Sequence, residues 1–173
     1  MKVIDLGAGN SVINHYMAQL RDVDYQKNRT LFRRNLERIA HAMAYELSKQ
    51  LSYAPAVVTT PLGEKHTQLT QERIVVGTVL RAGLAFHEGF LDVFDSADSA
   101  FVAAYREEGT KEELKIKLDY LAAPTLDGCT FLMVDPMLAT GGSACDAIES
   151  LKKRGCKNIR FMAIIGAPEG VSR

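Results

Sequence analysis

The sequence predicts an α/β fold, with a largely parallel β-sheet flanked by helices. Short apolar runs rich in β-branched residues, at 74–80, 130–134 and 159–165, are typical of strands that are buried on both faces. The first two runs are followed by stretches with apolar residues at helical spacing. The chain has 173 residues, a one-domain length that can bury a good core, so we expect a single domain over residues 1–173.

Residues 1–52 are expected to form an N-terminal helical arm. Between 28 and 51, apolar residues recur every three or four positions, which indicates an amphipathic helix that covers a core or meets a partner subunit. Before it, residues 3–9 (V-I-D-L-G-A-G) resemble the first motif of S-adenosylmethionine-dependent methyltransferases. The third glycine of that motif is missing and no second strand ending in an acid follows soon, so a methyltransferase is a remote alternative to a simple turn.

The run at 74–80 leads directly to Arg81. An arginine at the carboxyl end of a parallel strand points into the crevice where α/β proteins usually bind ligands. Its forked guanidinium suits a diphosphate group. The alternative is a surface arginine that happens to follow a strand. Residues 83–94 should continue as a helix with one buried apolar side.

Residues 101–120 are expected to form a β-hairpin. A short strand at 101–105 leads to Arg106, and a densely charged stretch then separates it from an alternating strand that reaches Tyr120. The Glu and Lys residues of that stretch are typical of an exposed, mobile hairpin tip. Arg106, at the end of the first strand, is the candidate functional residue.

Residues 130–155 carry the most informative functional pattern. A buried strand ends at Asp135, the loop P-M-L-A-T-G-G-S follows, and a helix then begins. The backbone N–H groups of Ala139 to Ser143 would be free to meet an anion at the helix N-terminus. Gly141 and Gly142 let the backbone approach phosphate oxygens closely. The spacing fits neither the nucleotide-triphosphate loop nor the dinucleotide-binding motif, and a tight turn that uses small residues for packing is the alternative.

The ten residues V-D-P-M-L-A-T-G-G-S, at 134–143, resemble the ribose-phosphate loop of uracil phosphoribosyltransferases, a branch of the type I phosphoribosyltransferases. The wider signature has two adjacent acids after the strand, whereas here Asp135 is followed by Pro136, as in the uracil branch. L-R-A-G-L at 80–84 resembles the family's pyrophosphate-binding loop, and the hairpin at 101–120 is similar to its flap. T-T-P-L-G at 59–63 and A-P-E-G-V at 167–171 extend the resemblance in one collinear order.

The resemblance implies transfer of ribose 5-phosphate from 5-phosphoribosyl 1-diphosphate (PRPP) to uracil, giving UMP and diphosphate in pyrimidine salvage. It implies catalytic roles for Asp135 and Arg106. Mg²⁺ is the implied cofactor, held mostly by phosphate oxygens rather than by dedicated protein ligands. The residues expected to bind PRPP are Arg81, Arg106, Asp135, Pro136, Met137, Leu138, Ala139, Thr140, Gly141, Gly142 and Ser143.

The acceptor base is less well indicated than the donor. Uracil phosphoribosyltransferases also carry a later loop, Y-I-V-P-G-x-G-D-A-G-D, whose backbone recognises the pyrimidine edge, and this sequence does not contain it. Either the sequence is truncated or uracil is not bound in the family manner, and the uracil-binding residues are unknown. A phosphoribosyltransferase for another base and a nucleotide-binding RNA regulator of the same fold remain as alternatives.

Composition narrows the class of protein. Lys and Arg (21) balance Asp and Glu (21), which argues against a dedicated nucleic-acid binder. No apolar run reaches membrane-spanning length, and the N-terminus lacks a signal-peptide pattern. Three cysteines without a C-x-x-C pair suit a reducing cytoplasm, and four scattered histidines give no metal-ligand spacing. We expect a cytoplasmic enzyme, and the resemblance implies a homo-oligomer, a dimer or higher.

Overall fold

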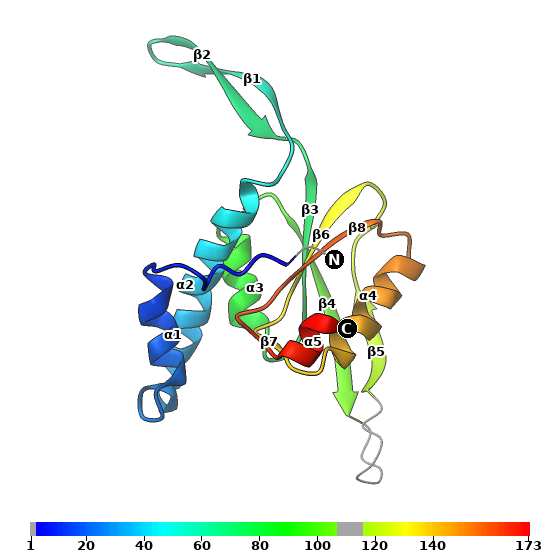
Figure 1. The fold of residues 1–173 in the computed structure, drawn as a ribbon. Helices are drawn as coiled ribbons and strands as arrows, with labels where there is room; N and C mark the ends of the chain where they lie inside the picture. Colours follow the sequence, from blue (N-terminus) through cyan, green and yellow to red (C-terminus); the bar gives the residue numbers. More distant parts are fainter. Residues whose placement is uncertain (1–2, 107–115) are drawn as a thin grey trace.

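The computed structural model describes residues 3–106 and 116–173, with side chains given outside 104–119. At its centre is a five-stranded sheet in the order β5-β4-β3-β6-β8, in which only β5 runs antiparallel to its neighbour (Figure 1). The strands are β3 (Arg73–Leu80), β4 (Asp98–Arg106), β5 (Ile116–Ala122), β6 (Cys129–Val134) and β8 (Asn158–Met162). The predicted α/β class with a largely parallel sheet is therefore confirmed.

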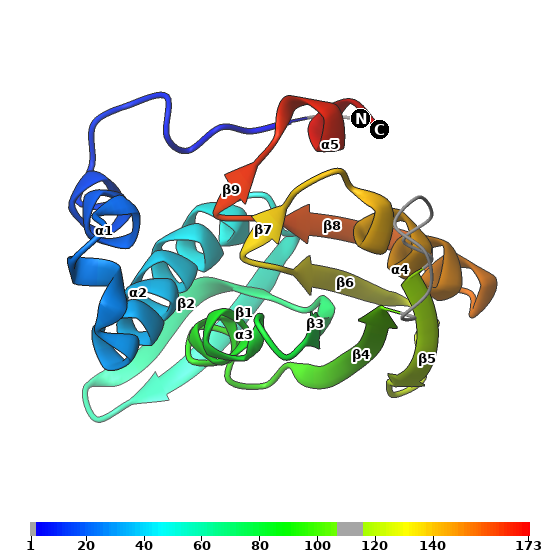
Figure 2. The same cartoon turned by 90° about the horizontal axis from the view of Figure 1, so that it is seen from below.

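Helices lie on both sides of this sheet (Figures 1 and 2). One side carries α1 (Ile13–Arg21), the short η1 (Tyr25–Lys27), α2 (Arg29–Ser48) and α3 (Leu84–Leu91). The other side carries α4 (Gly142–Lys153), and α5 (Pro168–Ser172) lies at the end of the chain. The helix expected over 83–94 ends at Leu91, three residues earlier than expected. One helical hydrogen bond continues beyond that end, because the buried Phe94 donates its N–H to the Phe90 carbonyl at 3.0 Å.

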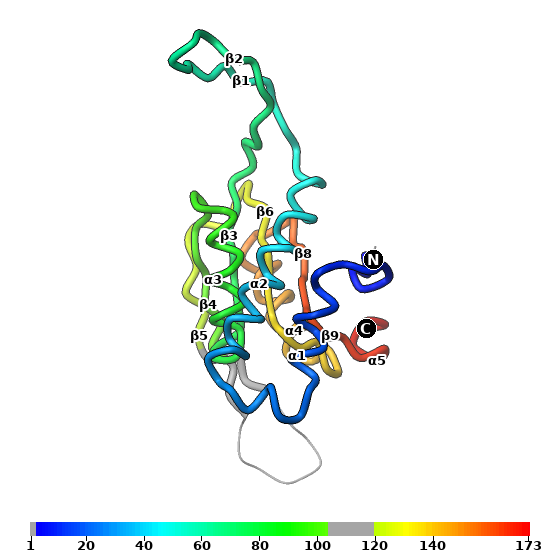
Figure 3. The backbone as a smooth tube through the Cα atoms, turned by 90° about the vertical axis from the view of Figure 1, so that its left-hand side faces the viewer, coloured from blue at the N-terminus to red at the C-terminus, as the bar shows by residue number. Residues whose placement is uncertain are grey.

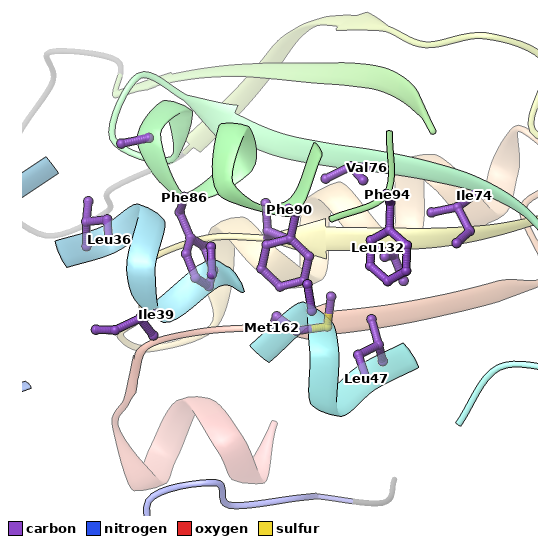
Figure 4. Packing of buried hydrophobic residues seen from close by; sticks show 14 of the residues in the cluster. Leu36, Ile39, Leu47, Ile74, Val76, Phe86, Phe90, Phe94, Leu132 and Met162 are labelled. Atoms are coloured by element: carbon purple, nitrogen blue, oxygen red, sulfur yellow. The ribbon is translucent and has the colours of Figure 1, made fainter. Parts of the chain in front are cut away.

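Each central strand alternates its side chains between two cores. On β3, Ile74 and Val76 join the core under α2 and α3, whereas Val75 joins the core under α4. Figure 4 shows the first core, where Phe86 and Phe90 of α3 pack edge to face with ring centroids 5.2 Å apart. Because both faces are covered, the two central strands β3 and β6 are largely apolar, as the sequence predicts.

The long helix α2 forms where its periodicity predicts. The side chain of Asn28 caps it by accepting the N–H of Leu31 at 3.2 Å. Its buried face packs on α3, and the contact is close because a Cβ added at Gly89 would lie 2.6 Å from the Cβ of Ala40. The helix thus covers a core, which was one of its two expected roles.

The amino-terminal glycine motif does not form the strand that a methyltransferase requires. Residues 3–9 are irregular and contain a turn, in which the N–H of Gly7 donates to Asp5 Oδ1 at 2.8 Å. The structure therefore matches the simpler interpretation of this stretch as an N-terminal turn.

A β-hairpin projects from the end of the sheet where the strands begin (Figure 3). It consists of β1 (Tyr53–Thr60) and β2 (Gly63–Thr70), which pair antiparallel over their whole length. Pro61 and Gly63 mark a loop at 59–63 in the sequence, but the pattern does not predict the two strands. Most of their side chains are exposed, so they lack the apolar alternation that marks a half-buried strand.

The strand expected over 159–165 is divided in two. β8 ends at Met162, whose carbonyl accepts the N–H of Asp135 at 3.0 Å. The N–H groups of Ile164 and Ile165 then turn to the Pro136 carbonyl, each at 3.2 Å, and β9 (Ile165–Gly166) pairs with β7 (Met137–Leu138). The prediction of one continuous strand is wrong, because the chain leaves the sheet with the loop that follows β6.

The helices of residues 3–106 and 116–173 include none with the length and apolar character needed to cross a membrane. Cys129, Cys145 and Cys156 are free thiols, and two of them, Cys129 and Cys156, are buried in the core under α4. Cys129 and Cys156 therefore serve as small core residues.

Candidate active site

The connections that leave the sheet diverge between β3 and β6. β3 continues into α3 on one face and then to β4, whereas β6 continues into α4 on the other face and then to β8. Such a switch point, at the carboxyl ends of the strands, is the usual place for a ligand in an open α/β sheet. Arg81 follows β3 and Asp135 follows β6, so the fold brings both to this edge, toward which Figure 2 looks.

The loop between β6 and α4 has a row of backbone N–H groups with no acceptor in the described part of the chain. Gly141 has φ +79°, a left-handed conformation that residues with a Cβ rarely adopt, and α4 begins at the next residue. Among the described residues, no hydrogen bond uses the N–H of Thr140 or Gly141. The N–H groups of Gly142 and Ser143 belong to the first turn of α4, which has no acceptor within the helix. An anion placed there would also meet the positive end of the helix dipole.

The last described residues pack against the outside of this loop. β9 runs beside β7, and the N–H of Ala167 donates to the Leu138 carbonyl at 2.8 Å. A Cβ added at Gly170, in α5, would lie 2.2 Å from the Ala139 carbonyl oxygen, so only glycine permits this approach. The loop is therefore held by backbone contacts with β9 and α5.

Asp135 is a partly buried carboxylate whose charge is stabilised by few partners in the described part of the protein. Its Oδ1 accepts the N–H of Met137 at 3.1 Å, and no basic side chain of the described residues forms a salt bridge with it. Burial raises the pKa of this carboxyl, and the hydrogen bond from Met137 offsets only part of that effect. A carboxylate held in this way at a sheet edge is ready to accept hydrogen bonds from hydroxyl groups of a ligand.

The two arginines come to the ends of neighbouring strands. Arg81 is exposed in the loop between β3 and α3, and the peptide bond that precedes it, from Leu80, is cis. β4 ends at Arg106, whose backbone pairs with Ile116 of β5. The hairpin expected over 101–120 is therefore formed by β4 and β5. The side chain of Arg106 and the hairpin tip at 107–115 lie outside the described part of the structure.

The edge is suited to a metal that the ligand brings with it rather than to a protein metal cage. In the described part of the chain, no three His, Cys, Asp or Glu side chains gather as a possible metal-binding group. Mg²⁺ usually keeps several waters and binds through one or two carboxylates together with substrate phosphates. Asp135, whose second carboxylate oxygen accepts from no donor among the described residues, fits that mode of binding.

Two features of the site are not predicted from the sequence. The first is the packing of α5 on the loop, although Pro168 at the first turn of α5 is a recognised helix-start signal. The second is Arg173, whose Nη1 lies 3.9 Å from the position of a Cβ added at Gly142. This places a positive charge beside the free N–H groups, and no motif in the sequence marks it.

The sequence matches a family model described as uracil phosphoribosyltransferase over residues 8–173. A uracil phosphoribosyltransferase of Porphyromonas gingivalis is 42% identical over 172 residues, which cover 99% of this chain and 80% of that protein. Another from Acholeplasma laidlawii is 38% identical, over 94% of this chain and 76% of its own length.

Solved structures give the same picture of the fold. The AQ2163 protein from Aquifex aeolicus superposes with a TM-score of 0.83 at 31% identity, over 95% of this chain and 77% of that one. A hypoxanthine phosphoribosyltransferase from Staphylococcus aureus superposes with a TM-score of 0.56 at 15% identity, over 79% of this chain and 65% of that one. At that low identity the second likeness supports the fold alone.

Gly142→Val should weaken PRPP binding by about 10- to 100-fold, because its side chain would keep a phosphate away from the loop N–H groups. Hydrogen bonds to charged groups contribute about 1.5–3 kcal/mol each. The nearest atoms to an added Cβ, Arg173 Nη1 and Thr140 Oγ1, are both 3.9 Å away, so the fold has room for the side chain. Calorimetry measures the affinity, and thermal unfolding checks the fold. Gly142→Ala should have a smaller effect. Normal affinity in a folded valine variant would contradict the anion cradle.

Asp135→Asn should make the protein more stable at neutral pH. The folded-state pKa of Asp135 is raised, so the ionised carboxylate costs stability above that pKa, and the cost disappears as pH falls toward the usual value of 3.8. The variant should therefore melt higher at pH 7, by about 2–4 °C per kcal/mol recovered, with a smaller difference near pH 4. Asp95→Asn, at an exposed carboxyl, serves as the control. A variant that melts lower at pH 7 would refute this description of Asp135.

Proposed function

The chain belongs to the uracil phosphoribosyltransferase family, and on that premise we propose that it transfers ribose 5-phosphate from PRPP to uracil, giving UMP and diphosphate in pyrimidine salvage. The observation that carries the proposal is the meeting of two different anion-binding features at one sheet edge. The free N–H groups at the start of α4 suit one phosphate, and Arg81 at the end of β3 suits another. PRPP has a phosphate at each end of its ribose, so a single molecule can use both.

The loop between β6 and α4 would hold the 5-phosphate. The backbone N–H groups of residues 140–143 would supply the donors, and the hydroxyls of Thr140 and Ser143 add two more. The packing of α5 on Ala139 supports this assignment, because a loop held on its outer side needs little rearrangement when the ligand binds. Arg173 beside Gly142 would add attraction for the phosphate.

Asp135 would bind the ribose. Its free carboxylate oxygen can accept hydrogen bonds from the sugar hydroxyls, which replaces the hydration that burial removes. As the bond from C1 to diphosphate lengthens, positive charge develops on the sugar, and a nearby carboxylate stabilises it. The partly buried position strengthens this interaction because the local dielectric is lower than that of water.

Arg81 and Arg106 would neutralise the departing diphosphate. Arginine pairs with phosphate through two parallel hydrogen bonds, which fixes the orientation of the leaving group as well as its charge. Mg²⁺ would be bound mainly by diphosphate oxygens with Asp135 nearby, and when present it supplies further charge neutralisation. Closure of the hairpin formed by β4 and β5 would exclude water from the activated sugar.

The enzyme would act as a homo-oligomer, in which the hairpin of β1 and β2 contacts a second copy of the chain. An isolated two-stranded hairpin is marginally stable in water, yet this one extends from the sheet without a covering layer (Figure 3). Its apolar side chains Val57, Val58 and Leu69 are 55%, 43% and 50% exposed. Val58 and Leu69 share one face of the hairpin, and a symmetric dimer would cover them with the same surface of the partner.

We further assign residues 1–173 to one domain in the cytoplasm. The core that joins α1, α2 and α3 also includes residues of β3 and β6, so the N-terminal arm and the sheet share one hydrophobic cluster. Free thiols at Cys129, Cys145 and Cys156 suit a reducing compartment.

Replacing Val58 and Leu69 by Asp should dissociate the oligomer, because each copy would then place charge in an apolar contact. The mass in solution, measured by analytical ultracentrifugation, should fall from a dimer or higher to a monomer. Val23→Asp changes a valine that is 69% exposed outside the hairpin and should leave the mass unchanged. A wild-type monomer, or a double variant with unchanged mass, would contradict the proposal.

A PRPP-dependent assay across a panel of bases tests the function itself. The protein should form UMP from uracil at least 100-fold faster than it forms nucleotides from other bases, and Asp135→Asn should lower that rate by roughly 10²–10³. Formation of product from adenine, guanine or hypoxanthine in preference to uracil would overturn the choice of base. Full turnover by Asp135→Asn would overturn the role of the carboxylate.

A further inference from the structure

One buried hydroxyl lies between the two strands that carry the site. Thr78, near the end of β3, is fully buried, and its Oγ1 donates a hydrogen bond to the Val134 carbonyl at 2.7 Å. Thr78 and Val134 are also the last paired residues of the β3–β6 ladder. Beyond this pair, β3 leads to Arg81 and β6 leads to Asp135.

The same hydroxyl also supports the loop that carries Arg81. A Cβ added at Gly83 would lie 1.8 Å from Thr78 Oγ1 and 3.2 Å from the Val79 carbonyl oxygen. The backbone after Arg81 therefore folds back onto the Thr78 hydroxyl, and glycine is required for that approach. Thr78 thus contacts the Arg81 loop on one side and the residue before Asp135 on the other.

We propose that Thr78 is a positioning residue that sets the separation of the diphosphate-binding loop from the ribose-binding strand end. The inference rests on the proposed function, in which Arg81 binds one end of PRPP while Asp135 and the loop before α4 bind the rest. Thr78 itself touches no reacting atom, because it is fully buried beneath the loop.

A ligand that spans both loops depends on their separation, whereas a fragment that binds one loop does not. PRPP gains affinity from linked contacts at both ends, and a displacement of about 1 Å can cost on the order of 100-fold in a well-oriented site. Diphosphate alone uses only the Arg81 loop, and ribose 5-phosphate alone uses only the β6 side. Loss of the Thr78 hydroxyl should therefore weaken PRPP much more than either fragment.

Thr78→Val removes the hydroxyl with almost no change in shape, and Thr78→Ser keeps it. Thr130→Val is the matched control. Thr130 is also buried, and its hydroxyl donates to Glu72 and accepts from Asn158, but it lies at the opposite end of β6. Thr78→Val loses one hydrogen bond and Thr130→Val loses two, so a general loss of stability should be at least as large in the control. Calorimetry gives the affinity for PRPP, ribose 5-phosphate and diphosphate, and steady-state kinetics gives kcat and KM.

Thr78→Val should raise the Kd and KM for PRPP by about 10-fold or more, and change the Kd of either fragment by less than about 3-fold. Thr78→Ser should restore PRPP affinity, and Thr130→Val should leave it unchanged. Unchanged PRPP affinity in Thr78→Val overturns the inference. Equal weakening of the fragments, or an equal effect of Thr130→Val, also overturns it, because the effect would then be local or general damage. Failure of the wild-type protein to bind PRPP instead overturns the proposed function, and the inference with it.

Discussion

The parallel pairing of β3 with β6 is the constraint on which the rest of the structure depends. Their side chains alternate between the core under α2 and α3 and the core under α4, so the two strands join both cores of the fold. Because each strand continues into a helix on a different face, the chain separates at their carboxyl ends and leaves room for a ligand there. The positions of Arg81 and Asp135 follow directly from that pairing.

The proposed anion site consists mainly of backbone rather than side chains. The left-handed Gly141 and the N–H groups at the start of α4 form the proposed cradle, and α5 packs against it through Gly170. Asp135 carries the opposite charge beside this cradle and is partly desolvated, which raises its pKa. Such a carboxylate costs stability in the free protein and becomes useful when a ligand supplies donors, a common exchange of stability for function.

Elements with a clear local pattern of apolar and polar residues could be predicted from the sequence. Apolar runs predicted β3, β6 and the start of β8, and the acid, loop and helix after β6 lie where the sequence pattern placed them, at the carboxyl edge of the sheet. The hairpin of β1 and β2 was not predicted, because exposed strands lack apolar alternation. Thr78 was missed for a different reason. A threonine within an apolar run is typical of any strand, and its contact with Val134 depends on pairing across 56 positions.

The division of one ligand between two loops is the central claim, and backbone amide chemical shifts measured by NMR test it most directly. Titration with ribose 5-phosphate should shift the amides of residues 140–143, and titration with diphosphate should shift those of residues 81–83. PRPP should shift both sets at once. If both fragments shift the same set, or if PRPP leaves one set unchanged, the two loops do not share the ligand and the account is wrong.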